Sequence, residues 1–153
     1  MKHMTLCYPI VDGQVLLAMK KRDFGKGKWN GPGGKIQLGE TDEAACLREV
    51  EEETGARVTE LVRVGTIESV FEGQADWNNI CTVFVASCRV EDVHETEEMC
   101  PRWFLIDEVP YDQMWEDDQH WLPQVLRGGS VSQRFYYDAK GMLARIENIP
   151  PSI

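Results

Sequence analysis

The spacing of apolar residues along the chain predicts several strands. An apolar run from Leu6 to Val11 is followed by a second run over 15–19. Asp12-Gly13 separates the two runs, and Asp-Gly in that position predicts a β-hairpin. Further strands are expected near 58–71, 79–90 and 103–106, with a closing hairpin that joins 134–137 to 142–146.

Helical spacing predicts one clear helix, from Asp42 to Thr54. Thr41 can cap its start, and Gly55 can adopt the left-handed conformation that ends it. A second helical region is expected over 111–127.

Two features interrupt this regular pattern. Pro123 divides the second helical region into two pieces, because proline is tolerated only near the start of a helix. Residues 23–40 are rich in glycine and predict a long loop. The expected fold class is α+β, with a mixed sheet between helices and a single domain over 1–153.

Composition narrows the classes of function. The net charge of −10 disfavours binding to duplex nucleic acid, whose affinity comes largely from Lys and Arg on phosphates. The five cysteines form no C-x-x-C pair, so we interpret them as buried or neutral thiols in a reducing compartment. No apolar run approaches the length of a membrane span, so a cytoplasmic protein is expected.

The predicted helix carries a stripe of carboxylates. At about 100° per residue, Glu49, Glu52 and Glu53 fall within an arc of about 100°. The apolar stripe expected on the opposite side consists of Leu47, Val50 and Thr54. Carboxylates three and four residues apart repel each other, and a hard cation such as Mg²⁺ reverses that penalty. Arg48 lies one turn before Glu52 and can orient it.

A solvated acidic helix face is the alternative interpretation, but it leaves the glycines, Glu40 and Arg48 unexplained. The segment resembles the Nudix box, G-x5-E-x7-R-E-U-x-E-E-x-G-U, in which U is a bulky apolar residue. The matching positions are Gly34, Glu40, Arg48, Glu49, Val50, Glu52, Glu53 and Gly55, and Ala56 departs from the last U.

This resemblance implies the Nudix fold and a metal site. It implies Mg²⁺, which Mn²⁺ can replace, held by the carbonyl of Gly33 and by carboxylates. Those carboxylates are Glu49, Glu52, Glu53 and Glu98. The resemblance leaves Glu52, Glu53 and Glu98 open as the general base.

A cationic stretch leads into the glycine loop. Its members are Lys20, Lys21, Arg22, Lys26, Lys28 and Lys35. A polyphosphate next to acidic residues favours such a rim. Lys20 is the best candidate for a phosphate contact, and a solubilising charge cluster is the alternative.

Beyond the box, the chain resembles the mammalian-type oxidized purine nucleoside triphosphate diphosphatases, which are MutT-like Nudix hydrolases. The shared segments include Trp29-Asn30-Gly31, Glu97-Glu98-Met99 and Trp115-x-Asp117-Asp118. The resemblance implies a purine pocket formed by Thr5, Asn30, Phe71, Trp115, Asp117 and Asp118. Ser69 and Pro32 stand where the family has aromatic residues.

Each pocket residue implied in this way has a chemical role. The amide of Asn30 both donates and accepts hydrogen bonds, so it can bind one base edge. Of two adjacent carboxyls, Asp117 and Asp118, one can stay protonated and donate while the other accepts. Trp115 can stack on the base. The alternatives are a helix cap for the aspartates and a turn residue for Asn30, whereas Trp29, Trp103 and Trp121 are expected in the core.

The resemblance therefore implies Mg²⁺-dependent hydrolysis of oxidised purine nucleoside triphosphates to monophosphate and pyrophosphate, which sanitises the nucleotide pool. A monomer acting on a small nucleotide is expected, with no duplex nucleic acid or membrane as partner. Two alternatives remain: hydrolysis of a normal nucleotide, dinucleoside polyphosphate or nucleotide sugar, and a nucleotide-sensing Nudix domain without catalysis.

Overall fold

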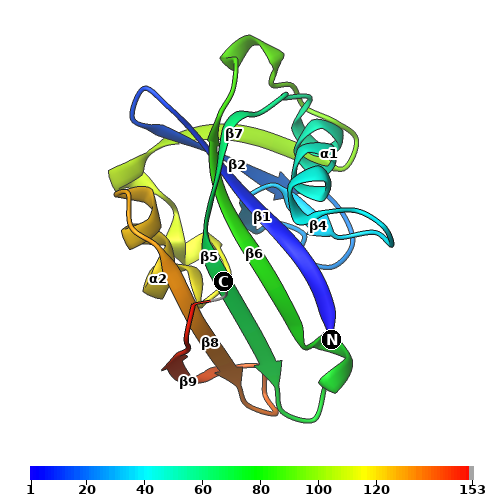
Figure 1. Ribbon diagram of the computed structural model, residues 1–153, viewed down its shortest axis with the longest axis vertical. Coiled ribbons are helices and arrows are strands. Elements are labelled where there is room, and N and C mark those ends of the chain that lie inside the picture. Colours follow the sequence, from blue (N-terminus) through cyan, green and yellow to red (C-terminus); the bar gives the residue numbers. More distant parts are fainter. Residues whose placement is uncertain (152–153) are drawn as a thin grey trace.

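The computed structural model describes residues 1–151 as a nine-stranded mixed sheet with an α-helix on each face (Figure 1). The helices are α1 (Asp42–Thr54) and α2 (Asp118–Leu126). The strands are β1 (Lys2–Val11), β2 (Gln14–Lys20), β3 (Trp29–Asn30), β4 (Gly33–Lys35), β5 (Thr59–Phe71), β6 (Asn79–Ser87), β7 (Met99–Leu105), β8 (Val131–Tyr137) and β9 (Leu143–Asn148). Four 3-10 turns complete the described chain: η1 (Ala75–Trp77), η2 (Val90–Asp92), η3 (Ile106–Glu108) and η4 (Tyr111–Gln113).

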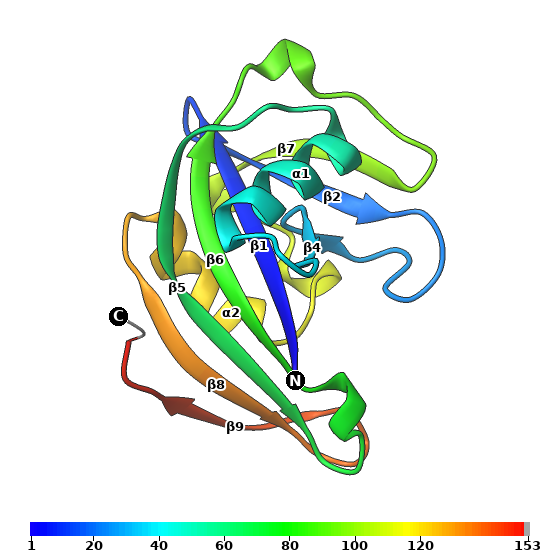
Figure 2. The same cartoon turned by 45° about the vertical axis from the view of Figure 1, so that its right-hand side comes forward.

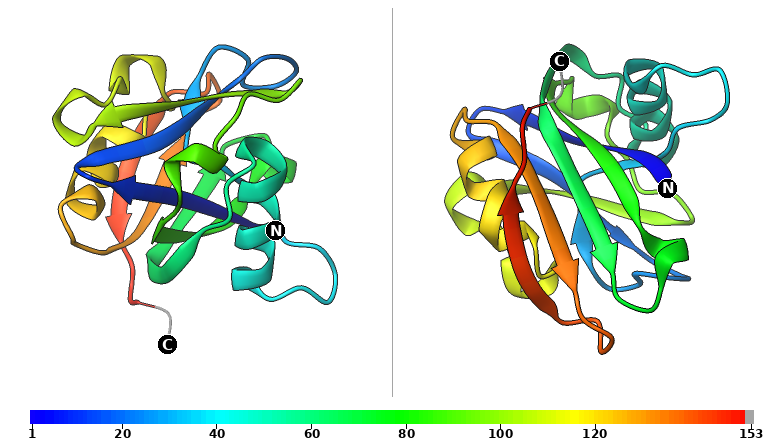
Figure 3. Two further views of the ribbon diagram at one scale, coloured as in Figure 1. Left: turned by 90° about the horizontal axis from the view of Figure 1, so that it is seen from above. Right: turned by 60° about the horizontal axis from the view of Figure 1, so that its bottom comes forward.

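The strands follow the order β3-β2-β1-β6-β5-β8-β9, while β4 also pairs with β1 and β7 with β2. The pairs β1–β6 and β5–β8 are parallel, and the other pairs are antiparallel. In Figure 2, α1 lies across one face of the central strands, and Figure 3 shows α2 on the other face. This arrangement confirms the predicted α+β class.

The first hairpin follows the turn chemistry of its sequence. Ile10 pairs with Val15 across the turn, and the two turn residues have positive φ, 50° at Asp12 and 77° at Gly13. Positive φ at both central residues is the requirement of a type I′ turn, which matches the twist of the flanking strands. The predicted hairpin is confirmed.

Two apolar layers hold the helices against the sheet. The layer beneath α2 is formed where that helix packs on the sheet and contains Tyr8, Leu17, Trp121 and Phe135. The layer beneath α1 is formed in the same way and contains Cys7, Cys46, Val50 and Phe84. Neighbouring residues of β1 point to opposite faces of the sheet, so Cys7 and Tyr8 contribute to different layers.

Long-range pairing changes two predicted boundaries. β7 begins at Met99, four residues before the expected strand, because it pairs with β2 from Lys20↔Met99 to Gln14↔Leu105. The glycine-rich segment predicted as a loop contains the short strands β3 and β4, which are held by β2 and β1. Both errors concern segments whose own pattern is weak and whose partners are distant in sequence.

The expectation for Pro123 was wrong in one respect. The predicted region does divide into η4 and α2, but Pro123 lies inside α2, at its sixth residue. Pro123 has no N–H to donate to the Gln119 carbonyl. Gln119 is exposed, so water can donate a hydrogen bond to that carbonyl instead. Within residues 1–151, no helix is long and apolar enough to cross a membrane.

Candidate active site

The carboxylate helix α1 has defined ends. The Thr41 hydroxyl accepts a hydrogen bond from the Ala44 N–H at 3.1 Å. Gly55 has φ 80°, and its N–H donates to the Glu51 carbonyl at 2.9 Å. Both predicted caps are confirmed, and they fix where the glutamates fall relative to the glycine loop.

The helix is rotated relative to the predicted wheel. Its buried residues are Ala45, Cys46, Val50 and Thr54. Leu47, expected on the buried stripe, is 43% exposed, which corrects that prediction. On a wheel of about 100° per residue, Glu53 lies only about 20° from Cys46, between Cys46 and Ala45, and therefore within the buried face.

This position perturbs the carboxyl of Glu53. Burial raises the pKa of Glu53 to about 8, and the charges of Glu49 and Glu52 add to the increase. The Gly33 N–H donates to Glu53 Oε2 at 3.2 Å and, with the charge of Lys20, opposes the increase in pKa. Glu53 is thus the box carboxylate with the most strongly altered acidity.

Arg48 orients the acidic cluster through a fork of hydrogen bonds. Its Nε and Nη2 donate to the two carboxylate oxygens of Glu40 at 2.7 and 2.9 Å, and its Nη1 donates to Glu49 Oε1 at 2.8 Å. The hydrogen bond to Arg48 lowers the pKa of Glu40 to about 2. The contact with Glu52, which the sequence suggested, is longer at 3.4 Å. Arg48 therefore positions Glu49 more closely than Glu52.

The glycines before α1 make room for these side chains. A Cβ at Gly34 would lie 2.6 Å from the carboxyl carbon of Glu49. A Cβ at Gly33 would lie 2.0 Å from the Thr5 carbonyl oxygen on β1. The glycine loop can therefore approach both β1 and α1 only without side chains at these positions.

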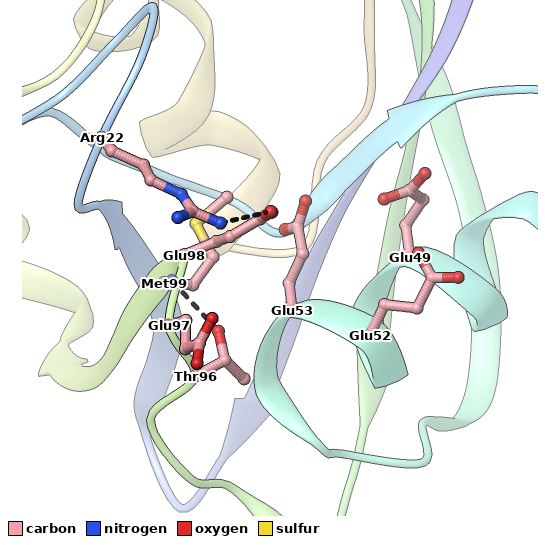
Figure 4. A pocket seen from close by; sticks show the side chains of 8 residues that line it. All are labelled: Arg22, Glu49, Glu52, Glu53, Thr96, Glu97, Glu98 and Met99. Atoms are coloured by element: carbon pink, nitrogen blue, oxygen red, sulfur yellow. Dashed lines mark hydrogen bonds and ion pairs between the residues drawn. The ribbon is translucent and has the colours of Figure 1, made fainter.

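Four of the predicted metal-site glutamates line one cavity of about 240 Å³ (Figure 4). Its lining residues are Arg22, Glu49, Glu52, Glu53, Thr96, Glu97, Glu98 and Met99. Glu98 reaches this cavity because β7 pairs with β2, and the Lys21 N–H donates to the Glu98 carbonyl at 2.9 Å. Thr96 was missed by sequence reasoning, and Glu97 was noted only as part of the segment shared with the family, without a role in the site. Among residues 1–151, no three metal-ligating side chains are close enough together to hold an ion as they stand.

The predicted cationic rim is partly paired. Lys21 forms an ion pair with Glu95, and Arg22 Nη2 lies 3.1 Å from Glu98 Oε1. Lys28 Nζ lies 5.1 Å from the centre of the Trp115 ring, in a cation–π contact. Lys20 is close enough to Glu53 for its charge to oppose the rise in the pKa of that carboxyl.

The two aspartates lie at the start of α2, where Asp118 is buried and Asp117 is half-buried. Asp117 accepts hydrogen bonds from Trp121 Nε1 and from the Tyr137 hydroxyl, both at 2.9 Å. Asp118 is 2% exposed, and its Oδ2 has no hydrogen-bond partner among the described residues. Burial raises the pKa of both carboxyls, well above the ordinary value for Asp118.

Helix capping does not explain these aspartates. Asp117 is the N-cap residue of α2, but within the described chain its side chain makes no capping bond. A buried carboxyl oxygen without a partner is unfavourable unless a ligand or water supplies a donor or acceptor. Asp117 is held by Trp121 and Tyr137, whereas neither capping nor another described side chain accounts for the Oδ2 of Asp118.

The remaining predicted pocket residues fall in different places. Asn30 Oδ1 accepts from the Gly31 N–H at 2.9 Å, which is the turn role considered from the sequence. Phe71 stacks on Tyr137, with ring centres 4.7 Å apart. Trp115 stacks on Phe24 at 5.5 Å. Tyr137 and Phe24 were missed, because a lone aromatic at a strand end or in a glycine loop gives no signal in sequence.

Thr5, which the resemblance placed in the purine pocket, lies on the opposite face of the sheet from Asp117 and Asp118. It is fully buried and pairs with Thr82, whose hydroxyl donates to Asp42 Oδ2 on α1 at 2.7 Å. Cross-strand neighbours share a face of the sheet, so Thr5 faces α1, whereas the aspartates lie on the α2 side. The structure therefore does not bring its side chain next to Asp117.

Other sequence expectations are confirmed in the core. All five cysteines are free thiols, and Cys7, Cys46, Cys81 and Cys88 are buried. Trp29 and Trp121 are buried, and Trp103 packs against the layer beneath α1.

Comparison with known proteins identifies the class to which this fold and site belong. The family model of the NUDIX domain matches residues 1–125, so the chain belongs to the Nudix family. It is 45% identical over 126 residues to the oxidized purine nucleoside triphosphate hydrolase of Danio rerio, covering 82% of this chain and 80% of that protein. It is 42% identical over 123 residues to the protein of the same name from Mus musculus, covering 80% and 78%.

Solved structures agree with this assignment. A crystal structure of the mutator MutT protein from Bacillus halodurans matches with a TM-score of 0.84 at 26% identity, covering 96% of this chain and 97% of that chain. The predicted Nudix fold is confirmed. Nudix hydrolases generally use a divalent metal ion.

Proposed function

We propose that this Nudix protein hydrolyses oxidised purine nucleoside triphosphates to nucleoside monophosphates and pyrophosphate, and so sanitises the nucleotide pool. The observation that carries the proposal is that one fold contains both a carboxylate-lined cavity at α1 and the adjacent carboxyls of Asp117 and Asp118 at α2. The names of the relatives from Danio rerio and Mus musculus support the same substrate class.

We propose Mg²⁺ as the metal, with Mn²⁺ as a substitute. The candidate ligands are Glu49, Glu52, Glu53, Glu98 and the Gly33 carbonyl. They fit a hard cation because all are oxygen donors, and because burial together with the like charges of Glu49 and Glu52 raises the pKa of Glu53, which a bound cation would oppose. When bound, the ion polarises phosphoryl oxygens and stabilises the leaving pyrophosphate.

The residues of the chain have separate roles in the proposed reaction. A carboxylate among Glu52, Glu53 and Glu98 takes a proton from the attacking water, whose oxygen bonds to phosphorus as the bond to pyrophosphate breaks. Lys20 binds the polyphosphate chain, and Arg48 keeps Glu49 in position.

Base recognition follows from the asymmetry of the aspartate pair. The two hydrogen bonds that Asp117 accepts favour its ionised form, whereas burial raises the pKa of Asp118 and so favours its protonated form, which can donate. Together with the Asn30 amide, this set offers donors and acceptors to an oxidised purine whose pattern differs from that of the normal base.

The substrate is tested with a hydrolysis panel of 8-oxo-dGTP, 2-hydroxy-dATP, dGTP and ADP-ribose in excess Mg²⁺. We expect kcat/KM to be at least tenfold higher for the oxidised purines than for dGTP. Equal rates on dGTP would contradict the sanitising function, and preferential hydrolysis of ADP-ribose would indicate a different Nudix substrate.

Catalysis is tested with Glu53→Gln. We expect turnover to fall by at least a hundredfold while thermal stability is kept, because the amide can neither take a proton nor bind the metal as an anion. Glu51→Gln is the matched control, since Glu51 is its exposed neighbour on α1. Retained turnover in Glu53→Gln would refute the assigned role.

We further propose that the protein acts as a cytoplasmic monomer on free nucleotides. The acidic net charge of −10 supports the absence of duplex nucleic acid or an anionic membrane as partner. Sedimentation of the purified protein, with and without duplex DNA, tests this part directly.

A further inference from the structure

A line of aromatic contacts leads outward from the aspartate pair. The Tyr137 hydroxyl donates to Asp117, and the ring of Tyr137 stacks on Phe71 with an interplanar angle of 10°. Phe71 in turn meets Trp77 edge to face, with ring centres 5.7 Å apart. Trp77 is the last residue of η1, so this turn is connected to the aspartates through aromatic rings.

A second line of contacts leads from Trp77 back to the chain segment that carries the aspartates. Trp77 lies 5.9 Å from Phe24, and Phe24 stacks on Trp115 at 5.5 Å. Trp115 precedes Asp117 by two residues. The aromatic contacts therefore form a circuit that starts at Asp117 and returns to the same segment at Trp115, and Trp77 is the member farthest along it from the carboxyls.

The two outer members of this circuit are exposed. Trp77 is 46% exposed and Phe24 is 69% exposed. Exposed apolar side chains that contact one another and rim a polar site mark a ligand-binding surface. Core packing does not account for either ring, since neither belongs to an apolar layer of the sheet.

Trp77 also has space to move. A cavity of about 160 Å³ adjoins it, and this cavity is lined by Phe71, Glu72, Gln74, Trp77, Asp138, Ala139, Lys140 and Gly141. An indole between such a cavity and the ring of Phe24 can turn aside as a base enters and then pack against it. Aromatic side chains stack on any base through its π-face.

We infer that Trp77 is a specificity-determining residue that contacts the base and closes the outer side of the purine pocket together with Phe24. This inference rests on the proposed function, because it assumes that a purine reaches Asp117 and Asp118. The larger π-surface of a purine gains more from the indole than a pyrimidine does, so Trp77 favours purine substrates.

The test compares Trp77→Ala and Trp77→Phe with the wild-type enzyme on 8-oxo-dGTP at saturating Mg²⁺. We expect KM to rise about 5- to 100-fold in Trp77→Ala, with kcat within about threefold, as loss of one stacking contact implies. Trp77→Phe keeps an aromatic face and should recover most of the loss. Leu105→Ala, which removes an equally exposed apolar side chain outside the circuit, should leave KM unchanged.

The possible outcomes distinguish a failure of the Trp77 proposal from a failure of the proposed function. Wild-type hydrolysis with an unchanged KM in Trp77→Ala overturns the role of Trp77 and leaves the proposed function intact. A fall in kcat alone, or a lowered thermal midpoint in Trp77→Ala, indicates a structural role and also overturns it. If the wild-type protein neither hydrolyses purine triphosphates nor binds 8-oxo-dGMP in calorimetry, both proposals fail.

A double-mutant cycle tests the partnership with Phe24. If the two rings close over the same base, Phe24→Ala and Trp77→Ala together should raise KM less than the product of the single effects. Strictly multiplicative effects would show that Trp77 acts without Phe24 and would overturn the shared outer wall.

Discussion

Glu52 and Glu53 are adjacent on α1, yet their environments differ. The Glu52 side chain is 60% exposed, whereas Glu53 lies within the buried face of the helix, where burial raises its pKa to about 8. The same contrast separates the half-buried Asp117 and the buried Asp118 from the exposed acidic residues of this chain. Burial, rather than residue type, therefore selects which carboxyls have a raised pKa.

At the residue scale, Arg48→Ala should weaken the metal site. Its fork holds Glu40 and Glu49, and loss of such supporting hydrogen bonds lowers metal affinity or activity by about 10- to 100-fold. Titration of activity against Mg²⁺ measures the effect. Arg63→Ala is the matched control, because Arg63 pairs with Asp42 and Glu43 at the other end of α1. Equal effects of the two variants would contradict this role.

The buried Asp118 predicts a specific dependence of stability on pH. Its pKa is raised in the folded state, so the folded chain holds the proton more tightly than the unfolded chain does. The resulting stability is fully present below the unfolded pKa of about 4 and is lost as pH rises through the folded value.

Asp118→Asn should remove this contribution. Relative to the variant, the wild-type protein should lose unfolding free energy as pH rises from 4 to 8, because only the wild type must ionise a buried group. Urea unfolding of both proteins in EDTA across this range measures the difference. A difference that is independent of pH would contradict the raised pKa.

At the scale of elements, the glycine loop and α1 work as one unit. The carboxylate of Glu49 on α1 lies so close to β4 that there is no room for a Cβ at Gly34. The obstructing atom is the end of a flexible side chain, so a substitution there moves the carboxylate rather than the backbone. A substitution at Gly34 should therefore lower activity without a matching loss of stability.

Gly34→Ala should lower kcat/KM by at least tenfold through displacement of Glu49. Stability should stay within about 1 kcal/mol of wild type, because alanine also reduces the entropy of the unfolded chain. Steady-state kinetics and urea midpoints measure both quantities. In a cycle with Glu49→Gln, the effects should be less than multiplicative. Full additivity would show that Gly34 acts on something other than Glu49.

At the scale of the whole molecule, two parallel pairings bring the site together. The β1–β6 and β5–β8 pairs place α1 and α2 on opposite faces, and the β2–β7 pairing carries Glu98 to the α1 cavity. The carboxylates of that cavity repel each other in a chain whose net charge is already −10. A bound divalent ion should therefore stabilise the entire fold.

Mg²⁺ at about 100 times its dissociation constant should stabilise the fold by about 2.7 kcal/mol, which raises Tm by about 5–10 °C for a chain of this size. Scanning calorimetry with Mg²⁺ and with EDTA measures the shift. Glu49→Gln should reduce it, and NaCl of matched ionic strength controls for simple screening. An equal increase with NaCl would contradict a specific site.

Local signals in the sequence determined the elements whose pattern is complete within one segment. Asp12-Gly13 specified the first hairpin, and Thr41 with Gly55 specified the ends of α1, since turn and cap chemistry act within a few residues. The spacing of the glutamates and glycines also sufficed to indicate the Nudix class.

The tertiary structure alone decided the rest, because it depends on contacts between distant segments. The packing of Cys46 and Val50 set the rotation of α1 and exposed Leu47, which no helical wheel can determine. The start of β7 at Met99 followed from its pairing with β2. The aromatic circuit of Trp77 joins five separate segments of the chain, and only the folded sheet brings them within reach of one another.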